Sequence, residues 1–291
     1  MKKLLMIILG VVAASFSRSQ VNEANPAQAG NRFFAGISYS FQSADLELWS
    51  MSLHSVWYGE DLGTHELSDR EIDEINAVID RDIVIHSINL EAGMSFLNNP
   101  DSKWHFNGKI FFGLSGSKSE IRNTVTDTME YSFDSEFSKP CSGVGFDVGY
   151  SFNPHWGVSL RPYFMGTIGK ITNIEDNINI KPENVTEVRQ DHYFVLYEHL
   201  SLMADFTAGH FTLSAGPGIY WVTSRHKYSI DRVNDLNGDT MFDEITSHAI
   251  SKSMIDGSIA VEWRIIDPLT FYATAGIAKD LFVNTGIHYN F

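Results

Sequence analysis

The chain has 291 residues, with 36 acidic against 21 basic side chains and a formal net charge of −15. This balance argues against nucleic acid as a partner, because phosphates must be neutralised by clustered lysine and arginine side chains. Cys141 is the only cysteine, which excludes an internal disulfide and a metal site of several thiolates. No cofactor is indicated, except that one loop raises calcium as a possibility.

The N-terminus has the three parts of a secretory signal. Lys2 and Lys3 precede an apolar or small run at 4–16, and Ser17 and Ser19 suit the −3 and −1 positions of a cleavage site. The run is shorter than the ~20 residues of a membrane-spanning helix. We therefore expect residues 1–19 to be a cleaved signal, 20–31 a short periplasmic segment, and 32–291 the folded protein.

From residue 32 onward, apolar residues recur at every second position, which is the pattern of β-strands. The alternate positions carry glycine, serine, threonine and charged residues, which suits a polar lumen with lipid outside. Ten runs show this alternation, so we expect about ten strands: 33–41, 88–96, 104–114, 144–152, 156–168, 196–206, 211–221, 255–263, 269–277 and 283–291.

The connections between these runs alternate in length. Short turns are expected near 98–103, 153–155, 207–210 and 265–268, and long acidic loops near 42–83, 116–142, 169–192 and 223–250. Aromatic residues flank the short turns, as they do at membrane–water boundaries. The sequence therefore predicts a transmembrane, antiparallel, up-and-down β-barrel with short periplasmic turns and long extracellular loops.

The first long connection contains a predicted helix. Ser68 and Glu71 fit a capping box, and Ile72, Ile75, Val78 and Ile79 form one helical stripe. The segment 59–82 is strongly acidic. It is interpreted as a helix lying on or in the barrel mouth, or as a surface that binds a partner.

Hairpin geometry predicts ion pairs inside the barrel. If Phe96 faces Trp104, Glu91 lies opposite Lys109 on the inner face. The next short turn places Asp147 opposite Arg161 in the same way. Unpaired charges in a narrow lumen are costly, so we expect these pairs to help close it. Ten strands enclose too little space for open diffusion, although a narrow solute channel stays an alternative.

An enzyme at the extracellular rim is a further alternative, either a protease or a lipid-modifying protein. The weak catalytic candidates are Asp191, His192 and His199, since such chemistry needs a histidine beside a carboxylate or a serine. The motifs of omptin proteases and of lipid A deacylases are not found in the sequence.

One loop has the spacing of a calcium site. Asp235, Asn237, Asp239 and Asp243 stand at positions 1, 3, 5 and 9, and calcium prefers such oxygen ligands. A solvated hairpin tip built on Asn237-Gly238 is the competing interpretation.

The C-terminal segment Asn284–Phe291 resembles the terminal strand signal of outer-membrane barrels, in which Gly286, Tyr289 and Phe291 would be read by the barrel assembly machinery. Val158–Pro162 and Leu213–Pro217 resemble a strand motif of Bacteroidota outer-membrane β-barrel families. The resemblance implies a monomer in the outer membrane, surrounded by lipid and lipopolysaccharide. We expect a lumen closed by polar and salt-bridged side chains, and a surface-binding or structural role.

Overall fold

A computed structural model describes residues 32–96, 103–170, 173–176, 185–234, 236–252, 254–277 and 281–291. The predicted signal at 1–19 and the segment 20–31 lie outside these residues. Within the described part of the chain, no helix is both long and apolar enough to cross a membrane.

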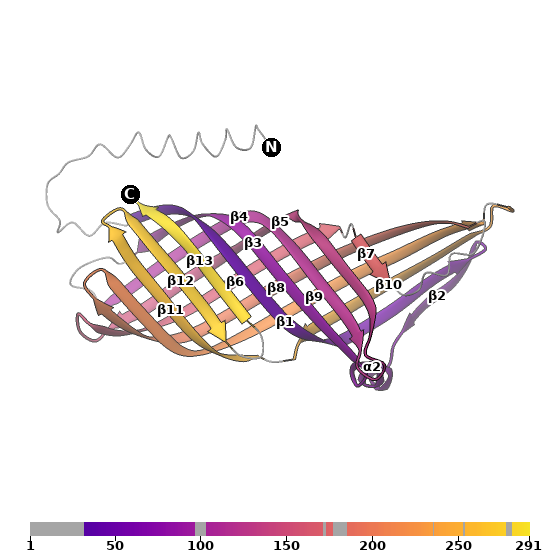
Figure 1. Cartoon of the computed structure of the whole chain (residues 1–291), viewed down its shortest axis with the longest axis horizontal. Helices are drawn as coiled ribbons and strands as arrows, with labels where there is room; N and C mark the ends of the chain where they lie inside the picture. The colour runs from indigo at the N-terminus through magenta and orange to yellow at the C-terminus, as the bar shows by residue number, and fades with distance from the viewer. Residues whose placement is uncertain are drawn as a thin grey trace.

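Ten antiparallel strands close into a barrel, as predicted (Figure 1). Each strand pairs with the next around the ring, and the last pairs with the first. In order, the ring contains β1 (Arg32–Trp57), β3 (Ile79–Phe96), β4 (Trp104–Asn123), β5 (Thr128–Ser151), β6 (Trp156–Lys170), β8 (Val185–Ala208), β9 (Phe211–Asn234), β11 (Ile255–Ile266), β12 (Leu269–Ile277) and β13 (Leu281–Asn290).

The outer face of the barrel carries an apolar belt. On β4 the exposed positions run from Trp104 to Leu114, and on β9 they run from Phe211 to Trp221. Eleven tilted strand residues cover ~25 Å, which is the height of a bilayer's apolar layer. Exposed aromatic residues mark the short-turn end of the belt, as predicted: Trp104, Phe152, Trp156, Phe206, Phe211, Trp263, Tyr289 and Phe291.

The predicted long loops are mostly continued strands, so that expectation is corrected. β5, β8 and β9 each have 24 residues, more than twice the ~10 needed to cross a bilayer. Their extra length projects beyond the belt as a tapering extension (Figure 1). Two short strands lengthen it: β2 (Glu60–Glu66) pairs with β1, and β7 (Asn173–Asp176) pairs with β5.

The barrel narrows because one strand replaces three. Above the belt, β10 (Thr240–Ser251) pairs with β9 on one side and with β1 on the other. Below it, the same edges of β9 and β1 pair with β11 and β13. A ring of ten strands thus becomes a collar of eight, in the order β1, β3, β4, β5, β6, β8, β9 and β10. The ten sequence runs contain no strand at β10, which was predicted as part of a loop.

Backbone groups at this step find partners outside the regular ladders. The amide of Leu281 donates to Ser43 Oγ at 3.0 Å, and the amide of Lys252 donates to the carbonyl of Asp45 at 2.9 Å. The amide of Val222 donates to Ser251 Oγ at 3.2 Å. These bonds satisfy backbone groups that the missing strand pairings would leave without partners.

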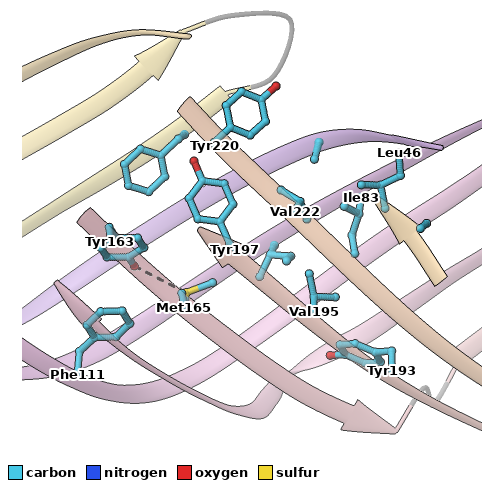
Figure 2. Close-up of a cluster of buried hydrophobic side chains, with 14 residues drawn as sticks. Leu46, Ile83, Phe111, Tyr163, Met165, Tyr193, Val195, Tyr197, Tyr220 and Val222 are labelled. Carbon is cyan, nitrogen blue, oxygen red and sulfur yellow. Dashed lines mark hydrogen bonds between the residues drawn. The ribbon is translucent and has the colours of Figure 1, made fainter. Parts of the chain in front are cut away.

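Buried side chains fill the interior from the upper part of the ten-strand ring, where β13 still contributes Phe282, into the collar above it. Five rings form what we call the aromatic layer: Phe111, Tyr163, Tyr197, Tyr220 and Phe282. Their centroids are 5.2 Å apart for Phe111 and Tyr163, 5.4 Å for Tyr163 and Phe282, and 5.2 Å for Tyr197 and Phe282. Figure 2 shows most of this layer together with the apolar residues above it. The predicted closure by polar and salt-bridged side chains is incomplete at this level, where aromatic and aliphatic residues fill the interior together with buried polar ones such as Ser40, Ser87 and Thr167.

The predicted helix is present but shorter. α2 (Asp69–Asn76) ends before Val78, and Ile79 already belongs to β3, so only the Ile72 end of the predicted stripe is buried. The amide and hydroxyl of Ser68 both donate to Glu71 Oε2, at 2.8 and 2.7 Å, and these bonds lower the pKa of the Glu71 carboxyl.

Asn76 holds α2 against the barrel. Between Leu46 and Ser52, β1 has no strand partner on the side where β3 ends and β2 has not yet begun. The amide of Leu48 donates to Asn76 Oδ1 at 2.8 Å, and Asn76 Nδ2 donates to the carbonyl of Leu48 at 2.8 Å. The side chain thus supplies the two hydrogen bonds that a neighbouring strand would make.

We expect Asn76→Ala to lower the free energy of unfolding by about 1–3 kcal/mol, because it leaves the Leu48 backbone groups without partners in a buried place. Urea unfolding of the detergent-solubilised barrel, followed by tryptophan fluorescence, measures this. Glu74→Ala in the same helix is the control, since Glu74 is exposed; it should change stability by no more than about 0.5 kcal/mol. Equal effects of the two variants would show that Asn76 does not have this role.

Candidate functional site

The short-turn half of the barrel encloses a cavity of about 670 Å³. Residues of the turns, including Asn153 and Asp267, line its rim, and the aromatic layer closes its inner end with Tyr163 and Phe282. We call this space the cup. Its charged and histidine lining residues are His105, Lys109, Asp147, His155, Arg161, His199, Asp205, Glu262, Arg264, Asp267 and His288.

On one wall of the cup the structure brings Glu91 and Lys109 together. Lys109 Nζ lies 3.0 Å from Glu91 Oε1 and 3.1 Å from Tyr272 Oη, which itself donates to Glu91 at 2.7 Å. The predicted register is nevertheless off by two residues: Phe96 faces Phe106, and Glu91 faces Phe111. The pair forms because the long lysine side chain reaches diagonally along the wall.

Gly286 makes room for this group. A Cβ atom at Gly286 would lie 2.7 Å from the carbonyl of Ile37 and 2.8 Å from Tyr272 Oη. β13 pairs with β1 through this region, and the amide of Phe291 donates to the carbonyl of Phe33 at 2.8 Å. Gly286 therefore has a packing reason to be glycine. Tyr289 and Phe291 lie at the belt's short-turn edge, and recognition by an assembly machinery stays a prediction.

On the neighbouring strands β5, β6 and β8, Arg161 bridges two carboxylates. Arg161 Nε lies 3.5 Å from Asp147 Oδ2, and Arg161 Nη2 lies 2.8 Å from Asp205 Oδ1. His105 Nε2 extends the group, at 3.4 Å from Asp147 Oδ1. The sequence placed Asp147 opposite Arg161. It did not place Asp205 or His105 beside them, because Asp205 lies on β8, at the other edge of β6, and His105 lies on β4, at the other edge of β5.

The catalytic candidates do not form a rim site. Asp191 is buried and contacts His226, whereas the adjacent His192 is exposed on the other face of β8, as alternation in a strand requires. His199 is buried deep in the barrel, where Asp256 Oδ2 at 3.0 Å and Ser258 Oγ at 3.2 Å both approach its Nε2. A catalytic triad needs serine and carboxylate on different ring nitrogens.

The residues of the predicted calcium loop are divided between two places. Asp235 lies outside the described residues. Asn237 and Asp239 bond to each other at the turn, with Asn237 Nδ2 2.6 Å from Asp239 Oδ2. Asp243 belongs to β10, where it binds Arg232 Nη1 at 3.1 Å and Ser55 Oγ at 2.7 Å. Among the residues that the structure describes, no three histidine, cysteine or acidic side chains are grouped to hold a metal ion.

No protein-family model matches the chain, and no curated protein sequence matches it. Solved structures with a similar fold include the outer-membrane protease OmpT of Escherichia coli, 9% identical, covering 92% of this chain and 99% of that one, with a TM-score of 0.38. The translocator domain of the autotransporter NalP of Neisseria meningitidis is 7% identical, covering 99% and 96%, with a TM-score of 0.39.

The outer-membrane protein OprG of Pseudomonas aeruginosa is 10% identical, covering 90% of this chain and 96% of that one, with a TM-score of 0.33. All three are outer-membrane β-barrel proteins of different function. Identities and scores at this level carry no argument about what this chain does, so its own residues must supply one.

We expect Lys109→Met to lower the free energy of unfolding by about 3–5 kcal/mol, because Glu91 would be left charged and buried without its cation. Adding Glu91→Gln should recover part of this loss, since the double variant buries no unpaired charge. Denaturant unfolding of the three proteins gives the comparison. If Glu91→Gln instead lowers the stability of the Lys109→Met variant further, the two residues do not act as a pair.

Proposed function

We propose that the chain is an integral outer-membrane β-barrel that is closed to through-flow and serves a surface-binding or structural role. The observation that carries this proposal is the filled interior: the aromatic layer crosses the upper part of the ten-strand ring, and apolar residues fill the collar of eight strands above it. An eight-stranded barrel encloses only enough space for its own side chains. A solute entering the cup would meet buried rings and not a continuous polar path.

The apolar belt supports a membrane location. A soluble barrel would not expose apolar side chains all around a band about as tall as a bilayer. The short turns at one end and the projecting strands at the other support an orientation with the cup facing the periplasm. The resemblance at Asn284–Phe291 supports insertion by the barrel assembly machinery. The resemblances at Val158–Pro162 and Leu213–Pro217 support membership of a Bacteroidota family, as a monomer among lipid and lipopolysaccharide.

The surface role belongs to the projecting strands and to α2. Every residue of β2 is exposed, and the helix presents Asp69, Asp73 and Glu74 to solvent. In Figure 1, α2 lies at the margin of the barrel and not across its mouth. This acidic, stably folded surface is where an extracellular partner would bind. A role for calcium at Asn237 and Asp239 would require ligands beyond the residues described.

No observation on the described residues favours the two alternative functions, a narrow solute channel and an enzyme at the extracellular rim. The channel is opposed by the filled collar. For the rim enzyme, Asp191 and His192 lie on opposite faces of β8, and His199 is buried below the collar.

Planar-bilayer recording tests the closure. We expect the refolded wild-type protein to give no discrete conductance steps. Truncating Tyr193, Tyr197 and Val222 together to glycine removes buried filling from β8 and β9, and should introduce a measurable leak.

The matched control truncates Phe194, Leu196 and Trp221, which stand beside those residues but on the outer face. It should stay closed. Conductance steps in the wild-type protein would overturn the proposal, and so would a leak of equal size in both triple variants.

A further inference from the structure

We infer that the cup is a binding site for a small organic cation bearing primary ammonium groups. A cavity of about 670 Å³ lies within the ~300–1,000 Å³ range of small-molecule sites. The inference goes beyond the proposed function, because it concerns the open end of the barrel and holds whether or not the collar conducts.

The cup carries more negative than positive charge. Lys109, Arg161 and Arg264 are its permanent cations. Four carboxylates line it, and a fifth, that of Glu91, is bound to Lys109. The four are Asp147, Asp205, Glu262 and Asp267. Low-dielectric walls concentrate the field of such an excess inside a cleft, which favours the entry of cations.

Glu262 is the carboxylate available to a ligand. Its side chain is exposed to the solvent of the cup, and it makes no hydrogen bond or direct ion pair within the described part of the chain. The neighbouring acids differ, because Arg161 binds both Asp147 and Asp205. A bound ammonium group would give Glu262 the charged partner that its neighbours already have.

Asn284 provides an independent indication of a hydrogen-bond donor. This residue is 4% exposed and lines the cup, yet its Oδ1 atom accepts no hydrogen bond from the residues described. A buried acceptor without a donor costs about 1–3 kcal/mol. An ammonium group carries three donors and no acceptor, so one such group can satisfy this atom.

Anions fit the cup less well. The cations at Lys109 and Arg161 are each already bound to carboxylates at 2.8–3.0 Å, and Arg264 interacts electrostatically with Glu262, so an anionic ligand would have to compete with these carboxylates. A neutral diol can donate to Asn284 but gains nothing from the excess charge. We therefore expect a cationic ligand to bind the cup more tightly than an anionic or a neutral one.

Three four-carbon probes of matched length test this: putrescine, 1,4-butanediol and succinate. Calorimetry on the folded, detergent-solubilised barrel should show putrescine binding at one site, with the diol and succinate at least about tenfold weaker. Glu262→Gln should weaken putrescine by about tenfold, as expected for a lost charged hydrogen bond. Asn284→Leu, which removes the carboxamide and with it the unsatisfied acceptor, should weaken it several-fold.

Glu60→Gln is the matched control, since it removes the same charge from exposed β2 at the other end of the molecule. It should leave putrescine binding unchanged. Equal weakening by Glu60→Gln and Glu262→Gln would mean diffuse attraction to an acidic protein and would overturn the inference. Binding of the diol as tight as that of putrescine would overturn it too, as would the absence of putrescine heat in wild-type protein that unfolds cooperatively.

Discussion

The replacement of β11, β12 and β13 by the single strand β10 is the constraint on which the rest of the molecule depends. A closed barrel's width follows from its strand number, so losing two strands narrows the interior to the width that side chains fill. Below the step, ten strands leave room for the cup. Above it, eight strands bring Tyr197, Tyr220 and Val222 within packing distance of the opposite wall.

The same step sorts the interior side chains by polarity. Water reaches the cup, so ion pairs such as Arg161 with Asp205 can be partly hydrated there. Above the cup, burial favours apolar residues, and the polar ones bond to each other, as Ser40 Oγ does to Ser87 Oγ at 2.6 Å. His199 and Asp256 lie at the boundary. Gly218 and Gly276 flank Asp256 so closely that a Cβ on either would collide with its carboxylate.

Much of this fold follows from period-two alternation. That pattern predicted the ring of ten strands, the apolar belt and the aromatic ends, because lipid on one side and lumen on the other impose it directly. The collar was missed because most of its strand residues lie beyond the apolar belt and are polar or charged, as in 117–123, 223–234 and 240–251, so they lack the apolar alternation that marks a lipid-facing strand.

The site was less predictable than the fold. Hairpin neighbours such as Asp147 and Arg161 can be inferred from a turn. Asp205 joins them from the next strand of the ring, whose register no short turn sets, and Tyr272 and Glu262 come from β12 and β11, at distances that depend on barrel width and tilt. The pairing of β10 with β1 could not be inferred, since the partners are far apart in the chain, as with Leu46 and Ser251.

The native thiol of Cys141 offers the most direct test of the central claim, that the collar is closed. Cys141 is the only cysteine, is buried on β5 and bonds to Asn89 Oδ1 at 3.2 Å. A water-soluble maleimide should leave it unlabelled in the folded barrel and label it after unfolding. Ser95→Cys in a Cys141→Ser background should label rapidly, because Ser95 lines the cup. Equally rapid labelling of Cys141 in the folded protein would contradict the account.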